Sequence, residues 1–415
     1  MSKGHLIHKL NLLIFVWILL AEFSAIAGPL EILQKDFKTA DSNESLLRQL
    51  AAAYPDQTEL VEIGHSAHGH PLIAINVSDQ THLSPKPSLF FNCAHHAVER
   101  LSVEYCYQIL VDLLKPENRS WLSKYRFWVL PVVNPDGLIE GHFTRKNGNG
   151  VDLNRNYPFK WGAVPEGSSG DPKSDYYRGK SPGSEPETHA IMNLANREKF
   201  VLSISFHTSA TKVLVPYTIP GAKDPTPDLG WDFANLIEQN SITHKNEQSG
   251  EFQKSGAGMK TYKPVKRLYA VDGTDQDWHY WANGTLALLV EGPFSNSKIA
   301  NYENSKTVTQ DFMPGFWKVM EYLEGLPKLL IQTTNKGFPA AASVMIKEFQ
   351  YFEGEAFTSS PVSGLYTFLF PEPGRYTAVA DSKEYPIQIS SGITVMKVST
   401  TSPLAYLDFG LFRLW

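Results

Sequence analysis

An imidazole and a carboxylate three residues apart, His96 and Glu99, follow a short apolar run at residues 89–91. The run predicts a buried strand, and residues 103–114 predict an amphipathic helix. Polar groups between a strand end and a helix lie where α/β proteins place their chemistry. Imidazole and carboxylate together suit a zinc ion. A surface ion pair would give the same short pattern, so partners elsewhere in the chain must decide.

A third candidate ligand is His207, which closes the apolar run at residues 201–206. Read alone, it would also fit a histidine satisfied in the core. Catalytic zinc takes three protein ligands and leaves one position open, and His96, Glu99 and His207 would supply those three. Asp152 could accept the second ring N–H of His96, which would fix the orientation of the imidazole.

Four more polar residues fit amide hydrolysis beside a free carboxylate. Glu291 follows five apolar residues, so it is either a surface residue or a general base that takes a proton from a zinc-activated water. Arg145 could stabilise an oxyanion. Asn154 and Arg155, on a Gly- and Asn-rich stretch, could bind a carboxylate, because arginine holds that group with two parallel hydrogen bonds. Either arginine alone could equally be a solvated loop charge.

The elements that must position these residues alternate between strands and helices, which predicts a mixed α/β sheet domain. Residues 141–186 carry little periodicity and predict a long loop, which is either functional or disordered. After residue 327 the chain changes to short strands separated by Gly, Pro and Ser turns, which predicts a small all-β sandwich. We expect strands near 60–77, 89–91, 125–133, 200–206 and 286–290, and helices near 41–54, 103–114, 187–196, 229–238 and 308–324.

The composition bounds the remaining possibilities. The chain has 415 residues and a formal net charge of −5 with no Lys/Arg block, which argues against nucleic acid as a partner. Its two cysteines, Cys93 and Cys106, lie in a predicted strand and helix, and we expect two buried free thiols.

Residues 1–27 are typical of a signal peptide. Lys3 and Lys9 precede an apolar run at residues 10–20, and Ala25-Ile26-Ala27 is a small-x-small cleavage signal. No later run reaches the length of about 18 apolar residues that a spanning helix needs. We therefore expect a monomeric protein that is secreted or periplasmic, without a membrane span after cleavage.

Together the motifs resemble the zinc carboxypeptidase family of the pancreatic carboxypeptidases A and B. The matching segments, in order, are His96-Ala-Val-Glu99, Thr144-Arg145-Lys146, the stretch Val151-Asp152-Leu153-Asn154-Arg155-Asn156, and Ser205-Phe206-His207. Tyr269 stands eight residues before Asp277-Trp278, where the family has its substrate-capping tyrosine, and Glu291 stands 14 after Asp277, like the family's catalytic glutamate. The resemblance implies a mixed eight-stranded sheet flanked by helices and one Zn²⁺ per chain.

The layout is similar to the regulatory branch of carboxypeptidases D, E, M and N, whose catalytic domain precedes a transthyretin-like sandwich. This implies a catalytic domain at 28–326 and a sandwich domain at 327–415. Thr218 replaces that branch's acidic residue, which selects basic C-terminal side chains. Gln276 resembles that branch and stands where pancreatic B-type enzymes have an aspartate. The preferred terminal residue is therefore open, with Asp272 and Asp275 as nearby acids.

We thus predict an exported zinc metallocarboxypeptidase that removes C-terminal amino acids from peptides or proteins. Glu291 and Arg145 are the expected catalytic residues, and the expected substrate-binding residues are Asn154, Arg155, Tyr269, Gln276 and Thr218. One alternative is a carboxypeptidase that trims peptidoglycan stem peptides. Another, of a different class, is a zinc-free binding protein with a degraded site.

Overall fold

The computed structural model describes residues 28–81, 85–139, 142–224, 226–241, 262–293 and 302–400, together with the short strand β19 (Phe412–Arg413). The predicted signal peptide lies outside the described residues. None of the described helices is both long and apolar enough to cross a bilayer.

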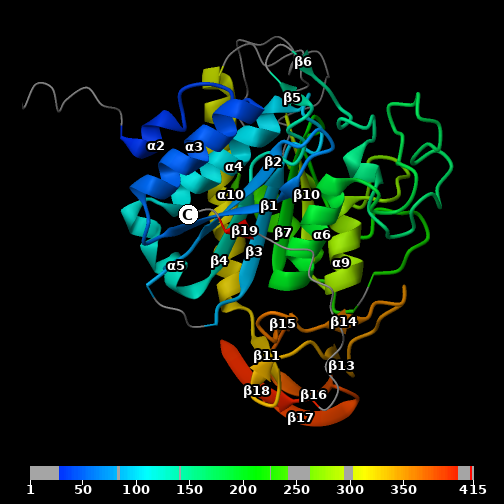
Figure 1. Ribbon diagram of the computed structural model, residues 1–415. Coiled ribbons are helices and arrows are strands. Elements are labelled where there is room, and N and C mark those ends of the chain that lie inside the picture. The colour runs from blue at the N-terminus through cyan, green and yellow to red at the C-terminus, as the bar shows by residue number, and fades with distance from the viewer. Residues whose placement is uncertain are drawn as a thin grey trace, which may run out of the picture.

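A large mixed sheet forms the centre of the molecule (Figure 1). Its strand order is β19-β1-β2-β4-β3-β7-β10-β8-β9. Eight of these strands are the eight that the resemblance implied, and β19 extends the edge beside β1. The strands are β1 (Thr58–His65), β2 (Pro71–Val77), β3 (Ser88–Cys93), β4 (Arg126–Leu130), β7 (Leu202–Thr208), β8 (Lys212–Leu214), β9 (Lys263–Val265) and β10 (Leu286–Gly292). A separate two-stranded sheet pairs β5 (Leu138–Ile139) with β6 (His142–Phe143).

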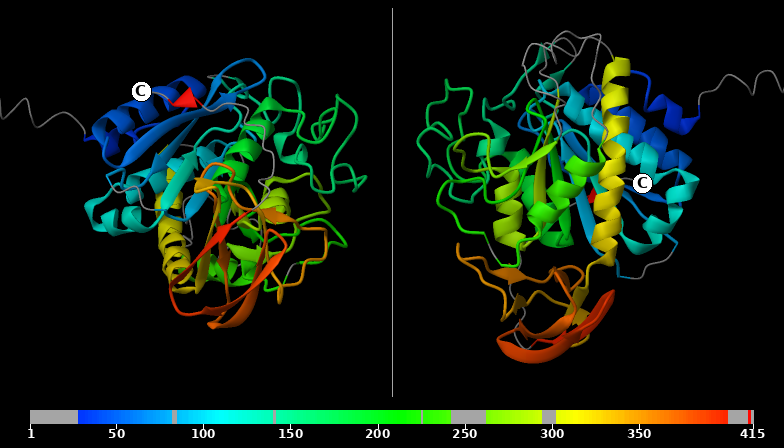
Figure 2. Two further views of the ribbon diagram at one scale, coloured as in Figure 1. Left: turned by 60° about the horizontal axis from the view of Figure 1, so that its bottom comes forward. Right: turned by 180° about the vertical axis from the view of Figure 1, so that it is seen from behind.

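Helices cover both faces of this sheet, because both faces of its central strands are apolar. The first core packs α3, α4, α5, α7 and α10 against one face, and the second packs α6 and α9 against the other. Figure 2 shows the long α10 from behind. The helices are α2 (Pro29–Ile32), α3 (Ala40–Ala53), α4 (Arg100–Leu113), α5 (Arg119–Lys124), α6 (Pro186–Glu198), α7 (Gly230–Asn240), α9 (Asp275–Asn283) and α10 (Tyr302–Gly325), with 3-10 turns η1 (Pro116–Asn118) and η2 (Leu153–Arg155).

The centre of the sheet is parallel, which brings strand ends together at one edge. In the order β4-β3-β7-β10, each strand is parallel to the next one. The pairing sets Glu291 of β10 opposite His207 of β7. Residues that follow β3 and residues that close β7 and β10 therefore lie at the same carboxyl edge, where open α/β sheets bind ligands.

Residues 328–400, which we call the C-terminal β unit, form two small sheets below the large one (Figure 1). Their inner faces share one apolar core of residues such as Leu329, Tyr366 and Ile389. This arrangement confirms the predicted small β structure. Its strands are β11 (Lys328–Asn335), β12 (Phe338–Pro339), β13 (Ser343–Ile346), β14 (Phe357–Thr358), β15 (Leu365–Leu369), β16 (Gly374–Ala380), β17 (Lys383–Ile389) and β18 (Ile393–Ser399).

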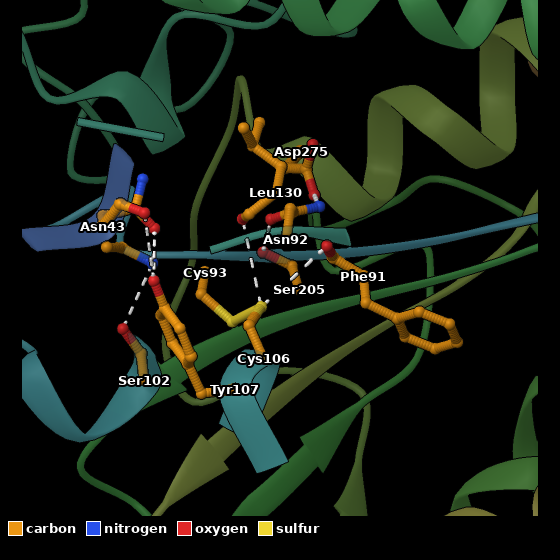
Figure 3. Close-up of a disulfide and its surroundings, with 11 residues drawn as sticks. Asn43, Phe91, Asn92, Cys93, Ser102, Cys106, Tyr107, Leu130, Ser205 and Asp275 are labelled. Atoms are coloured by element: carbon orange, nitrogen blue, oxygen red, sulfur yellow. Dashed lines mark hydrogen bonds between the residues drawn. A yellow bond between two sulfur atoms is a disulfide. The ribbon is translucent and has the colours of Figure 1, made fainter. Parts of the chain in front are cut away.

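The two cysteines form a disulfide, so the expectation of two free thiols was wrong. Cys93 at the end of β3 bonds to Cys106 in α4, with their Cα atoms 6.4 Å apart (Figure 3). Packing of α4 across β3 brings the two side chains together, and both are fully buried. Because the bridge joins the strand before His96 to the helix after Glu99, it closes a short loop around both residues.

Candidate active site

Two histidines and a glutamate meet at the carboxyl edge of the sheet. His96 and Glu99 lie on the connection from β3 to α4, and His207 lies in β7. One ligand atom from each lies within 4.8 Å of the others, and all three residues are buried. Glu99 Oε1 is 2.8 Å from His96 Nδ1, and Glu99 Oε2 is 3.0 Å from His207 Nδ1. The predicted triad is therefore brought together around one point.

The backbone before His96 makes this geometry possible. Ala94 follows β3 with a φ of 59°, a left-handed conformation that costs a residue other than glycine about 1–2 kcal/mol. The turn is held by hydrogen bonds, because the Ala94 amide donates to Ser102 Oγ at 3.1 Å and its carbonyl accepts from the Asn134 amide at 3.0 Å. It redirects the chain from the strand toward Glu99, the N-cap of α4.

Asp152 fixes the orientation of His96, as predicted for a residue behind the site. Its Oδ1 accepts from His96 Nε2 at 2.8 Å, and its Oδ2 accepts from Arg145 Nε and Nη2 at 2.9 and 2.7 Å. Arg145 Nη1 lies 3.3 Å from His96 Nδ1, and a guanidinium can only donate. Because the Asp152 carboxylate holds Nε2, the ring nitrogen that is available to bind a cation beside Glu99 is Nδ1.

The charges of the cluster reinforce one another. Burial and the Arg145 charge would lower the pKa of His96, but the Glu99 and Asp152 carboxylates outweigh them and raise it. Burial opposes ionisation of Glu99, yet His96 and His207 hold its pKa well below the usual range. Glu99 is thus an anion against two ring nitrogens. Imidazole nitrogens and a carboxylate are ligands that zinc takes in proteins, so the donor set fits this ion.

Glu291 closes β10 beside the triad and is partly buried. Its Oε2 is shielded from solvent and has no hydrogen-bond partner among the described residues. Burial, followed by the Glu99 charge, raises the pKa of Glu291 to about 7. A carboxylate with a pKa near neutrality can accept and return a proton at physiological pH, as a general base must.

Asn154 and Arg155 lie on η2, on the side of the cluster beyond Asp152. The Asp275 amide at the start of α9 donates to Asn154 Oδ1 at 2.8 Å, and Arg155 Nη2 donates to the Tyr269 hydroxyl at 3.1 Å. Gly273 permits this close packing, because its φ is +64° and a Cβ there would lie 2.4 Å from the Arg155 carbonyl oxygen. Tyr269 is 53% exposed, as expected for a residue at the mouth of a site.

A cavity of about 250 Å³ connects all of these groups. Beyond the triad it is bounded by Leu214, Val271, Leu289, Thr274 and Gln276, and Glu99 and Glu291 are the only carboxylates among its described lining residues. The remaining lining residues are His96, His207, Arg145, Asn154, Arg155, Thr208, Ser209, Ala210, Leu268 and Tyr269.

Three residues that the sequence suggested for substrate selection lie behind the cavity wall. Thr218 was expected to bind substrate, but it is fully buried and donates from its amide and hydroxyl to Asp277. It is not among the described residues that line the cavity. Asp272 accepts from the Val164 amide, and Asp275 pairs with His279 at 3.3 Å. None of these three offers a charge to a ligand in the cavity.

Sequence reasoning missed Tyr176, an exposed aromatic residue of the long loop. The Arg145 guanidinium lies 5.2 Å from the centre of its ring, and the Arg155 guanidinium lies 5.9 Å away. Arg155 is also 5.9 Å from the Tyr269 ring, so two tyrosines flank this arginine. The only signal in the sequence was an aromatic pair at residues 176–177 in a stretch otherwise rich in Gly, Ser and Asp.

Comparison with known proteins agrees with this geometry. The zinc carboxypeptidase family matches residues 43–312. Mast cell carboxypeptidase A of Homo sapiens is 26% identical over 247 residues, which cover 55% of this chain and 56% of that protein. Carboxypeptidase A6 of Mus musculus is 27% identical over 263 residues, covering 59% and 57%. The chain thus matches less than two thirds of the length of these relatives.

Solved structures share the fold of the large sheet. Bovine thrombin-activatable fibrinolysis inhibitor, in complex with a tick carboxypeptidase inhibitor, superposes with a TM-score of 0.57 at 22% identity, covering 70% of this chain and 98% of that one. Carboxypeptidase A from Helicoverpa armigera gives 0.58 at 21% identity, covering 70% and 74%. At these identities the similarity establishes the architecture alone.

Proposed function

Because the chain belongs to the zinc carboxypeptidase family, we propose that it is an exported zinc metallocarboxypeptidase, which removes C-terminal amino acids from peptides or proteins. One observation carries this proposal: the His96, Glu99 and His207 cluster opens into the same cavity as Arg155 and its neighbours. A metal site beside a carboxylate-binding arginine is what cleavage next to a free C-terminus requires.

His96 Nδ1, the Glu99 carboxylate and His207 Nδ1 would hold one zinc ion per chain. The two ring nitrogens lie 2.8 and 3.0 Å from the Glu99 carboxylate oxygens in a buried cluster, where a cation would bind all three groups. When bound, zinc supplies Lewis acidity, which polarises a carbonyl and makes water a better nucleophile at neutral pH. Asp152 would hold the His96 ring in place for this role.

The protein side chains then divide the work of amide cleavage. Arg155, with Asn154 and Tyr269, binds the terminal carboxylate and so places the last peptide bond near the cluster. Glu291 accepts a proton from water as its oxygen attacks the carbonyl carbon, and Arg145 offsets the negative charge on the carbonyl oxygen. Glu291 then returns that proton to the departing amine as the C–N bond breaks.

We further propose that the enzyme prefers an uncharged C-terminal residue. The cavity wall beyond the cluster is formed by Leu214, Val271 and Leu289 with the neutral polar residues Thr274 and Gln276. Gln276 Oε1 and Thr274 Oγ1 are buried and have no partner within the part of the chain that the structure describes, so they could bond to a small polar side chain. Apart from Glu99 and Glu291 at the cluster itself, the described lining residues offer no acid that would offset the lost hydration of a lysine or arginine side chain.

Three further parts of the proposal concern the whole chain. Residues 1–27 are a cleaved signal peptide, so the mature protein is secreted or periplasmic. Residues 28–326 form the catalytic domain, to whose sheet β19 adds an edge strand, and the rest of residues 327–415 form an accessory domain. The protein acts as a monomer.

Products from a synthetic peptide library, read by mass for each C-terminal residue, test this proposal. We expect loss of single terminal residues with zinc present, and none from Glu291→Gln, which should retain its zinc. Glu321→Gln on α10 is the matched control, because its carboxylate is exposed and pairs with Lys318 on the protein surface. Full turnover by Glu291→Gln, or cleavage of purified muropeptides in preference to peptides, would overturn the assignment.

A further inference from the structure

One loop of the C-terminal β unit contacts the large α/β unit close to the segment that leads to the active-site wall. The segment between β13 and β14 extends beside α9 (Figure 1). Glu353 in this segment pairs with Lys160 at 2.8 Å, accepts from the Lys223 amide at 2.9 Å, and offers its carbonyl to Trp281 Nε1 at 3.0 Å. The loop is therefore held against three separate parts of the large α/β unit.

Two residues beyond Glu353, Glu355 reaches into the large unit and binds Tyr217. The Tyr217 hydroxyl donates to Glu355 Oε1 at 2.6 Å, while Glu355 Oε2 accepts from the Glu353 amide at 2.8 Å. Tyr217 is fully buried and stacks on Phe159 with ring centres 4.6 Å apart. Burial and then this hydrogen bond raise the pKa of Tyr217, so its hydroxyl keeps the proton that it donates.

From Tyr217 the chain runs directly to the cavity wall. The amides of Thr218 and Ile219 and the Thr218 hydroxyl all donate to the Asp277 carboxylate. Gln276, the residue before Asp277, lines the cavity and lies 3.4 Å from Thr218 Oγ1.

The same segment also contacts the chain that carries Tyr269. Arg267, two residues before Tyr269, donates to the Thr218 carbonyl oxygen at 3.4 Å. Residues 217–219 thus connect Glu355 on one side with both Gln276 and the Tyr269 segment on the other.

We infer that Glu355 is a positioning residue for the terminal-residue pocket, acting through Tyr217 on the wall that contains Gln276. This inference rests on the proposed function and gives the C-terminal β unit a role in substrate selection. A short hydrogen bond from a buried hydroxyl to a carboxylate oxygen restrains the segment more strongly than packing alone. Without it, residues 217–219 gain freedom, and the pocket fits its preferred side chain less closely.

The test compares Glu355→Ala, Tyr217→Phe and Glu355→Gln in the full chain. We expect KM for the preferred peptide to rise roughly two- to ten-fold in the first two, with kcat changed less than about two-fold, because one hydrogen bond outside the reacting groups is lost. The ratio of kcat/KM between the preferred terminal residue and less preferred ones should decrease. Glu355→Gln keeps an acceptor for the Tyr217 hydroxyl and should restore the wild-type KM.

Amide hydrogen exchange at Thr218 and Ile219 gives a second measurement that needs no activity. Exchange should be faster in Glu355→Ala than in the wild type, and unchanged in Glu384→Ala, which removes an exposed pair with Lys347 in the same β unit. A lowered Tm with unchanged KM and unchanged exchange would overturn the inference. If the wild type cleaves no peptide, the proposed function fails, while the exchange result still decides whether Glu355 restrains residues 217–219.

Discussion

Replacing Asp152 by Asn tests the arrangement behind the metal site. The fully buried carboxylate accepts from His96 Nε2, from two nitrogens of Arg145 and from the Asn154 amide. An asparagine of the same size has one acceptor oxygen and one NH₂ group, so in either orientation it loses the bond to His96 or the bonds to Arg145. Loss of such an outer carboxylate weakens metal binding roughly 10–100-fold, which is about 1.4–2.7 kcal/mol.

The assay is zinc titration of the apoprotein against a competing chelator, followed by kinetics at saturating zinc. We expect the zinc Kd to rise by the stated factor, and kcat to remain reduced at saturation because either the His96 ring or Arg145 has lost its acceptor. Glu198→Gln is the control, because Glu198 is also buried and paired with arginines, Arg126 at 2.7 Å and Arg197 at 3.1 Å, but does not line the cavity. Equal zinc affinity in Asp152→Asn and the wild type would refute this account of His96 orientation.

Three further predictions concern pH and stability. Burial lowers the pKa of Lys199 to about 7, so the folded state prefers the neutral amine, and stability should fall by roughly 2 kcal/mol as pH decreases from about 9 to about 7. Urea unfolding of Lys199→Met should lack this component, and an identical pH slope would contradict it. The kcat/KM should fall on the acid side with a midpoint at or below about pH 7, because the reaction needs the base form of Glu291 and a nearby cation favours that form. Constant activity down to about pH 4 would exclude Glu291 as the base. Removing the disulfide with Cys93→Ala and Cys106→Ala should lower the free energy of unfolding by about 3 kcal/mol, the loop-closure value for its 13-residue separation, and thermal denaturation with an unchanged Tm would oppose this.

The local part of the site could be predicted from the sequence, because it depends on spacing. His96 and Glu99 are three residues apart after an apolar strand, and the structure places them in one cluster. His207 and Glu291 each close an apolar run, and parallel strands bring such ends to one edge. The long-range convergence therefore followed from strand ends together with the resemblance to a family.

Other features depend on packing that spacing does not encode. The Cys93–Cys106 bond forms because α4 crosses β3 at a Cα separation of 6.4 Å, whereas the sequence shows only two apolar contexts. Thr218 holds the position of a specificity residue by residue counting, yet it faces Asp277 behind the wall. The Tyr176 ring lies against the Arg145 guanidinium, and it belongs to a loop whose sequence has no periodicity. In each case the partner comes from a distant segment, and its direction is set by tertiary contacts.

The most direct measurement of the central claim is zinc K-edge X-ray absorption on the purified full-length protein. We expect one zinc per chain with two imidazole nitrogens at about 2.0–2.1 Å and carboxylate oxygen at about 2.0–2.2 Å. His207→Ala should lose one of the two nitrogen ligands. Absence of zinc, or a coordination shell unchanged by His207→Ala, would contradict it.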